Sequence, residues 1–210
     1  YSRKIDFNLV KGQSGTRLEM QRLRKTWDRK SWRQLRKELK NLVTPFRKLR
    51  GFKIIAKAEG WETGEVGSLF EETNSYSCTF SLSKSGHFDR ILSRPKHITQ
   101  KLKKKREKAE EEHLGKPLYG PIKGTFYYVK SPRLLKQLEF DPGISVYRDG
   151  FLVEPYGRQN DDWLGVKSKK ASRQGHAPIN PNQLFGFVEI TYKDNPDLKD
   201  VTNREGLQDS

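Results

Sequence analysis

The sequence predicts an α+β fold in which strands and a few helices share the chain. Alternation of apolar and polar residues, the period of a strand, runs through residues 76–82 (YSCTFSL) and 144–153 (ISVYRDGFLV). A helical period instead links residues 32 to 43. The length of 210 residues is enough for one domain, or one domain and part of another, with a buried core.

The first fifty-eight residues predict the order strand, helix, strand. Residues 16–22 suit a short strand, and residues 52–58 (FKIIAKA) suit another. Between them, one helical stripe is formed by Trp32, Leu35, Leu39, Leu42 and Val43. Either Asp28 or Ser31 is expected to cap this helix, and Pro45 to end it. Its other side carries four cations, Arg33, Arg36, Lys37 and Lys40.

The middle of the chain predicts a connection, a hairpin and an insertion. Residues 59–75 are acidic and contain glycine, which is typical of a connection. The strand at 76–82 should turn at 83–86 into a second strand near 88–92. Residues 94–117 contain a basic run with too few apolar residues for a buried face. They are expected to form an exposed helix or a mobile insertion.

The last third contains the clearest local signal. Asp149 and Gly150 lie between two alternating apolar runs, which predicts a type I′ hairpin. The other expected elements are a strand ending near residue 130, a helix starting at Pro132, a long polar loop over 157–183, a buried strand over 184–192 and a helix start at 204–208. Long loops in compact domains often carry function.

Charge is concentrated near the N-terminus. The chain has 42 Lys and Arg against 26 Asp and Glu, a net charge of +16. Residues 1–50 hold 16 of the cations and only 4 of the anions. Such an excess of positive charge favours binding to a nucleic acid or another polyanion. The alternative is a solvated helix face that only keeps the protein soluble.

Cysteine content and hydropathy restrict the setting of the protein. A single cysteine, Cys78, excludes an intrachain disulfide framework and a cysteine-based zinc site, and fits a reducing, cytoplasmic location. No apolar run approaches the roughly 18 residues of a membrane span, so no membrane partner is expected. Because the chain starts at YSRKIDF, without Met or a signal peptide, it is interpreted as a fragment or a processed product.

No complete active site is visible in the sequence. The four histidines are dispersed, and neither a HExxH helix, a GxSxG elbow nor a phosphate-binding GxxxxGK[ST] loop occurs. Cys78 lies in an alternating strand, where a buried structural thiol is expected. The Asp161–Asp162 pair has the ligand type for a cation, but such pairs in polar loops are usually solvated.

Several motifs together resemble the GHKL superfamily, whose ATP-binding domain is the Bergerat fold. The superfamily includes gyrase B subunits, the ninety-kilodalton heat-shock chaperone, histidine kinases and the mismatch-repair ATPase. At the N-terminal end, Gly15-Thr16 opens a strand that is followed by a basic helix and a strand. Toward the C-terminus, YRDGF, PYG, DWLG, NQLFGFVEIT and NPDLKDVTNREGL look like bacterial heat-shock-ninety-like ATP-binding proteins, some of them encoded in defence contexts.

The resemblance implies a division of the chain and a role for four residues. Residues 1–58 would end the ATP-binding domain, 59–75 would connect, and 76–210, with the insertion 94–117, would form the transducer. Gly15 and Thr16 would end the ATP lid, the Thr hydroxyl helping to hold the adenine-binding carboxylate. Arg204, beside Asn203, would reach the γ-phosphate, a task that suits the charged, forked guanidinium.

The sequence departs from the family at the nucleotide site. No glutamate is followed four residues later by asparagine, the pair that would orient water and hold Mg²⁺. The Asp-x-Gly-x-Gly loop for adenine is also missing. The resemblance therefore implies that ATP and Mg²⁺ bind the intact parent through a missing N-terminal segment, which would also support an ATP-dependent homodimer. This chain alone is expected to bind no cofactor and no metal and to be inactive.

Two other interpretations remain open. The chain could be a non-enzymatic nucleic-acid-binding module that uses the basic helix, with Trp27 and Trp32 among its cations. It could also be a protein-binding remnant of a degenerate ATPase. Binding that weakens steeply with salt would favour the first, and indifference to replacement of Arg204 in the longer protein would favour the second.

Overall fold

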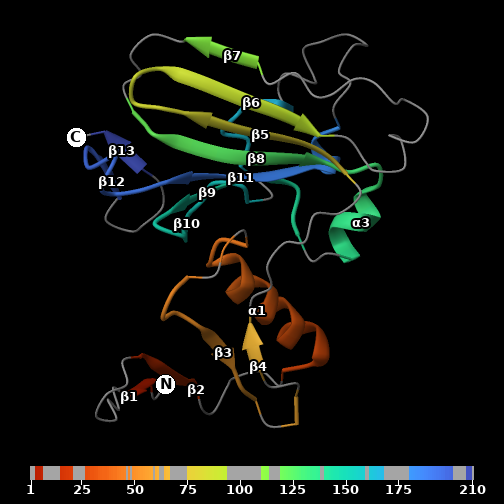
Figure 1. Ribbon diagram of the computed structural model, residues 1–210. Coiled ribbons are helices and arrows are strands. Elements are labelled where there is room, and N and C mark those ends of the chain that lie inside the picture. Colours follow the sequence, from red (N-terminus) through yellow and green to blue (C-terminus); the bar gives the residue numbers. More distant parts are fainter. Residues whose placement is uncertain are drawn as a thin grey trace.

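The computed structural model describes residues 3–6, 15–20, 27–45, 47, 49–58, 60–61, 64–66, 75–93, 110–113, 119–137, 140–158, 161–167, 180–200 and 207–209. Within these ranges, one large sheet is combined with two-stranded ladders and α-helices (Figure 1). The predicted α+β class is therefore confirmed.

The main sheet has seven strands and mixed direction. In spatial order they are β10 (Phe151–Val153), β9 (Gly143–Arg148), β11 (Leu184–Ile190), β8 (Ile122–Tyr128), β5 (Tyr76–Leu82), β6 (His87–Ser93) and β7 (Glu110–His113). β9 and β11 run parallel, with Phe185 opposite Gly143, and every other neighbouring pair is antiparallel. Parallel strands need a long crossover connection between them. The long connection between β10 and β11 allows β11 to run parallel to β9.

Both faces of this sheet bury apolar side chains near β9 and β11. One face joins Tyr127, Tyr147, Phe185 and Phe187 to Val129 and to Leu135 of α3 (Pro132–Gln137). The other face buries Ile144, Val146, Val153, Val188 and Ile190, against which Tyr156 and Leu164 pack. Because β11 is buried on both faces, its apolar residues do not simply alternate with polar ones, and Glu189 is the single charged residue of the strand.

The N-terminal part is built around α1 (Arg29–Asn41). The Asp28 carboxylate caps the helix by accepting a hydrogen bond from the Ser31 amide at 2.7 Å. The apolar stripe of α1, centred on buried Trp32, packs against β3 (Ile54–Ala56) and β4 (Gly64–Val66). β1 (Arg3–Asp6) and β2 (Arg17–Met20) form a separate ladder, so β2 and β3 do not share a sheet.

Several sequence predictions are confirmed here. The hairpin at 144–153 is present, and positive φ angles of 52° at Asp149 and 88° at Gly150 are those that a type I′ turn requires. The strands expected at 76–82 and 88–92 are β5 and β6, and the strand expected at 184–192 is β11. The predicted order of strand, basic helix and strand is β2, α1 and β3.

Other local predictions are wrong. Residues 110–113, expected in an exposed helix or mobile insertion, form β7, because the edge of β6 offers them backbone partners. Leu207 and Gln208, expected in a helix start, belong to β13 (Leu207–Asp209), which pairs with β12 (Leu198–Asp200). α1 ends at Asn41, and Val43 forms a bridge to Phe151 instead of another helical turn.

Two segments expected to be irregular contain short elements. β4 lies inside the predicted connection 59–75, where it pairs with β3. The 3-10 helix η1 (Pro181–Gln183) ends the predicted loop 157–183, capped by the Asn180 side chain. The other residues of the insertion 94–117 lie outside the described ranges.

Candidate functional site

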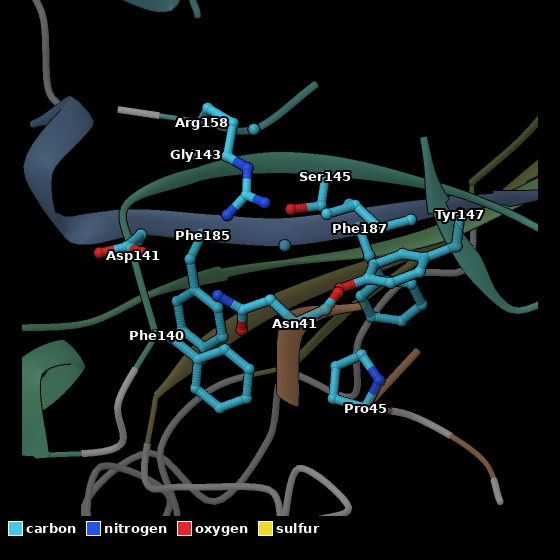
Figure 2. Close-up of a pocket in the computed structure, with 13 residues that line it drawn as sticks. Asn41, Pro45, Phe140, Asp141, Gly143, Ser145, Tyr147, Arg158, Phe185 and Phe187 are labelled. Atoms are coloured by element: carbon cyan, nitrogen blue, oxygen red, sulfur yellow. The ribbon is translucent and has the colours of Figure 1, made fainter. Parts of the chain in front are cut away.

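The C-terminal half of α1 meets the main sheet at the β9–β10 edge, and we call this contact the α1–sheet joint (Figure 2). Its polar members are Lys37, Glu38, Asn41, Asp141, Tyr147, Glu154 and Arg158. The apolar stripe of α1 faces β3 and β4, which leaves the polar side of the helix to meet the sheet.

Arg158 connects the two sides of the α1–sheet joint. One Nη1–H donates to Glu38 Oε2 of α1 at 2.7 Å, and Nε–H donates to Glu154 Oε2 at 2.7 Å. Nη2 also contacts the other oxygen of Glu154, so that this pair is bidentate. Hydrogen bonds with Glu154 and, to a smaller extent, with Glu38 raise the pKa of Arg158, although partial burial by itself lowers this pKa. The guanidinium is thus a permanent cation shared by two carboxylates.

Two further polar contacts lie on either side of Arg158. Lys37 Nζ lies 2.6 Å from Asp141 Oδ1, and the Tyr147 hydroxyl donates to the Asn41 carbonyl at 3.2 Å. Burial raises the pKa of Tyr147, which keeps the phenol protonated and able to donate. The Asn41 carbonyl is among the last of α1, where helix carbonyls lack intrahelical partners. Tyr147 therefore satisfies a helix end from the sheet.

Backbone hydrogen bonds continue the α1–sheet joint beyond the helix. The Leu152 amide donates to the Leu42 carbonyl at 3.0 Å, and the Thr44 amide donates to the Gly150 carbonyl at 2.8 Å. Together with the bridge between Val43 and Phe151, these bonds place residues 42–44 along the outer edge of β10. The hairpin tip is therefore tied directly to the segment that leaves α1.

A small cavity of about 40 Å³ lies inside the α1–sheet joint. Figure 2 shows Arg158, Ser145 and Tyr147 around it, with the Phe140 and Phe185 rings on another side. This volume suits a few water molecules, since one needs about 10–15 Å³. Ion pairs and room for water favour a movable contact over a substrate pocket.

The residues assigned to ATP by the resemblance are only partly within the described ranges. Gly15 and Thr16 are exposed and lie directly before β2. No atom lies within 4 Å of a Cβ placed on Gly15. Asn203 and Arg204 fall outside the described residues.

The four cations of α1 do not form one open basic face. Arg33 is exposed, whereas Arg36, Lys37 and Lys40 are half-buried. Lys37 is paired with Asp141, and the Lys40 ammonium lies 4.8 Å from the centre of the Phe140 ring. Trp32, offered as a stacking residue, is 6% exposed. A nucleic acid lying along this helix would have to displace contacts that hold the α1–sheet joint.

Other candidate chemistry is weak within the described ranges. Burial raises the pKa of Cys78, so its thiol is less ionised than a free one. Asp161 and Asp162 accept hydrogen bonds from the amides of Gly157 and Lys167. Among the described residues, no group of three or more His, Cys, Asp or Glu could hold a metal. The helices found there are all too short or too polar to cross a membrane.

Comparisons with known proteins find no match to any family model, curated protein or solved structure. The choice of site therefore depends on its geometry. Sequence reasoning missed Arg158, Glu38 and Tyr147. Two signals were available: Glu38 is the single acidic residue within α1, and Arg158 follows Glu154 at the four-residue spacing of an ion pair.

Proposed function

We propose that this chain comprises the end of the ATP-binding domain and the transducer of an ATP-dependent conformational switch of the GHKL type. In this proposal, the nucleotide state of the parent protein changes how β2, α1 and β3 sit against the main sheet. That movement would be passed on as domain motion or dimerisation, in a bacterial defence or DNA-associated system.

The observation that supports the proposal is the polarity of the α1–sheet joint. The apolar stripe of α1 is buried against β3 and β4, so these elements would move with the helix. Its contact with the sheet instead includes ion pairs and hydrogen bonds beside a small cavity that polar and aromatic side chains line together. Parts of a chain that move resemble transient interfaces, which are more polar than permanent ones. Such contacts can be exchanged for water at low cost.

The resemblance supplies the residues that would sense ATP. Arg204 would contact the γ-phosphate, with Asn203 beside it, and Gly15 and Thr16 would lie at the end of the ATP lid. A cation at the γ-phosphate stabilises charge in phosphoryl transfer and reports whether that phosphate is present. We assign no ATP or Mg²⁺ contact to the α1–sheet joint.

ATP turnover by the full-length gene product tests the sensing role. Replacement Arg204→Ala should lower turnover by roughly 10- to 10³-fold, because a group that contacts the transferred phosphoryl is removed. Arg133→Ala, at an exposed arginine of α3, is the matched control and should leave turnover unchanged. Equal turnover of the two variants would overturn the assignment of Arg204.

A distance measurement tests the switch itself. Spin labels at exposed Lys30 on α1 and exposed Ser81 on β5 can be introduced after Cys78→Ser. The proposal expects their distance distribution to shift when a non-hydrolysable ATP analogue binds the full-length protein. A distribution that stays the same while the analogue is bound would contradict movement at the α1–sheet joint.

A further inference from the structure

Three exposed aromatic rings, those of Phe52, Phe151 and Tyr192, lie near the tip of the β9–β10 hairpin around the buried Arg148, and we call this group the aromatic corner. The Phe52 and Phe151 rings meet edge to face at 5.0 Å. Phe151 lies directly opposite Arg148 across β10 and β9, so the two side chains share one face of the sheet. The Arg148 guanidinium lies 4.9 Å from the centre of the Tyr192 ring.

These rings are exposed although they are held in place. The exposed fractions are 42% for Phe52, 43% for Phe151 and 60% for Tyr192. Tyr192 is anchored by its amide, which donates to both carboxylate oxygens of Asp149 at 3.2–3.3 Å. Arg148, itself only 7% exposed, lies over the Tyr192 ring, most of whose surface remains exposed. Exposed apolar side chains that gather in one place, rather than singly, are a feature of interaction sites.

Cations border the aromatic corner. Arg50 and Lys53 lie on either side of Phe52 in the sequence, and Lys193 follows Tyr192; all three are exposed. Asp149, the carboxylate at the hairpin tip, is engaged by the Tyr192 amide. Protein interfaces are depleted in lysine, whereas surfaces for single-stranded nucleic acid combine a positive groove with aromatic platforms. The charge of the corner therefore favours a polyanion with planar groups.

We propose that the aromatic corner binds single-stranded nucleic acid. Bases stack on the exposed rings of Tyr192 and Phe52, while Arg50, Lys53 and Lys193 contact phosphates. Bases inside a duplex are already stacked on one another, so exposed rings select unpaired strands. This surface differs from the basic face of α1, and the proposal is independent of ATP.

Fluorescence anisotropy with the complete 210-residue chain tests the proposal. The probes are labelled (dT)15, (rU)15 and a duplex of equal length, each measured at several NaCl concentrations. We expect binding of a single strand in preference to the duplex, and the two single strands distinguish DNA from RNA. Tyr192→Ala and Phe52→Ala should each weaken binding by about 5- to 150-fold, the effect of losing one base stack.

Two control variants separate stacking from folding and from charge. Tyr192→Phe keeps the ring and should bind like the natural chain, whereas Leu18→Ala removes an exposed apolar side chain of β2 outside the corner and should have no effect. Lys53→Ala and Lys193→Ala should each reduce the salt slope of log affinity by about 0.7. Thermal unfolding is measured for every variant.

Three results would overturn the proposal. Failure of the natural chain to bind either single strand would exclude nucleic acid and leave a protein partner as the occupant of the corner. Full binding by folded Tyr192→Ala and Phe52→Ala would place the contact elsewhere. Binding of the duplex as tightly as the single strands would exclude stacking. None of these results would affect the proposed ATP switch, whose readouts are turnover and a label distance.

Discussion

Removal of Arg158 should loosen α1 from the main sheet by a measurable free energy. The side chains of Arg158 and Glu38 are 32% and 41% exposed, so their attraction is partly screened by water. Exposed ion pairs contribute about 0.2–1 kcal/mol, and the short charged hydrogen bond at 2.7 Å places this pair near the upper end, at about 1 kcal/mol. Arg158→Ala alone should cost about 2 kcal/mol, because Glu154 also loses its partner.

Urea unfolding of four proteins measures this contribution. These are the natural chain, Arg158→Ala, Glu38→Ala and the double variant. The coupling energy is the change in unfolding free energy of the double variant minus the sum of the changes in the two single variants. The expected coupling energy is about 1 kcal/mol. Hydrogen exchange should show that the amides of α1 are protected less in Arg158→Ala than in the natural chain, while those of β5 and β8 stay unchanged.

A second double-mutant cycle, between Glu38 and an arginine that it does not contact, is the control. Glu38→Ala combined with Arg133→Ala should give no coupling, because exposed Arg133 lies on α3 and is not the partner of Glu38. A coupling energy below about 0.2 kcal/mol between Arg158 and Glu38 would refute the reasoning, since it would place the pair among surface contacts without measurable effect.

Three other predictions concern a glycine with positive φ and two groups whose pKa values are shifted. Gly157→Ala should lower the free energy of unfolding by about 1–3 kcal/mol. The reason is that φ of Gly157 is +80° and the new Cβ would lie 2.7 Å from a backbone nitrogen of β9. The control Gly15→Ala should melt like the natural chain, because no atom lies within 4 Å of its new Cβ. Hydrogen bonds from Ser31 lower the pKa of the Asp28 carboxyl from 3.8. Asp28 therefore stabilises α1 fully above that pH, and this stabilisation is lost as pH falls through the lower pKa of the folded state. Helicity followed by circular dichroism should show the loss, and the loss should be smaller in Asp28→Asn, which keeps the cap without the titrating group. Cys78, whose pKa burial raises, should react with iodoacetamide at pH 7 more slowly than glutathione does, and an equal rate would contradict its burial in the strand.

Signals that span a few residues predicted their elements well. The Asp149–Gly150 turn was predictable because a type I′ hairpin needs two consecutive positive φ angles, and Asp-Gly tolerates them. The period of one helix predicted the buried position of Trp32, and its start predicted a cap at Asp28 or Ser31, of which the structure has Asp28. The same local reasoning failed at residues 110–113, since an acidic run becomes a strand only when the edge of β6 is beside it.

The sequence by itself determined the α+β class, the basic first fifty residues, the hairpin and the apolar stripe of α1, because each depends on composition or on neighbours within one or two turns or strands. Only the tertiary structure decided that β9 runs parallel to β11, that Arg158 meets Glu38 across 120 positions, and that Phe52, Phe151 and Tyr192 share one surface. The physical reason is that strand order and ion-pair partners are chosen by burial of the whole chain. Periodicity reports which face of an element is apolar, and not what will cover it.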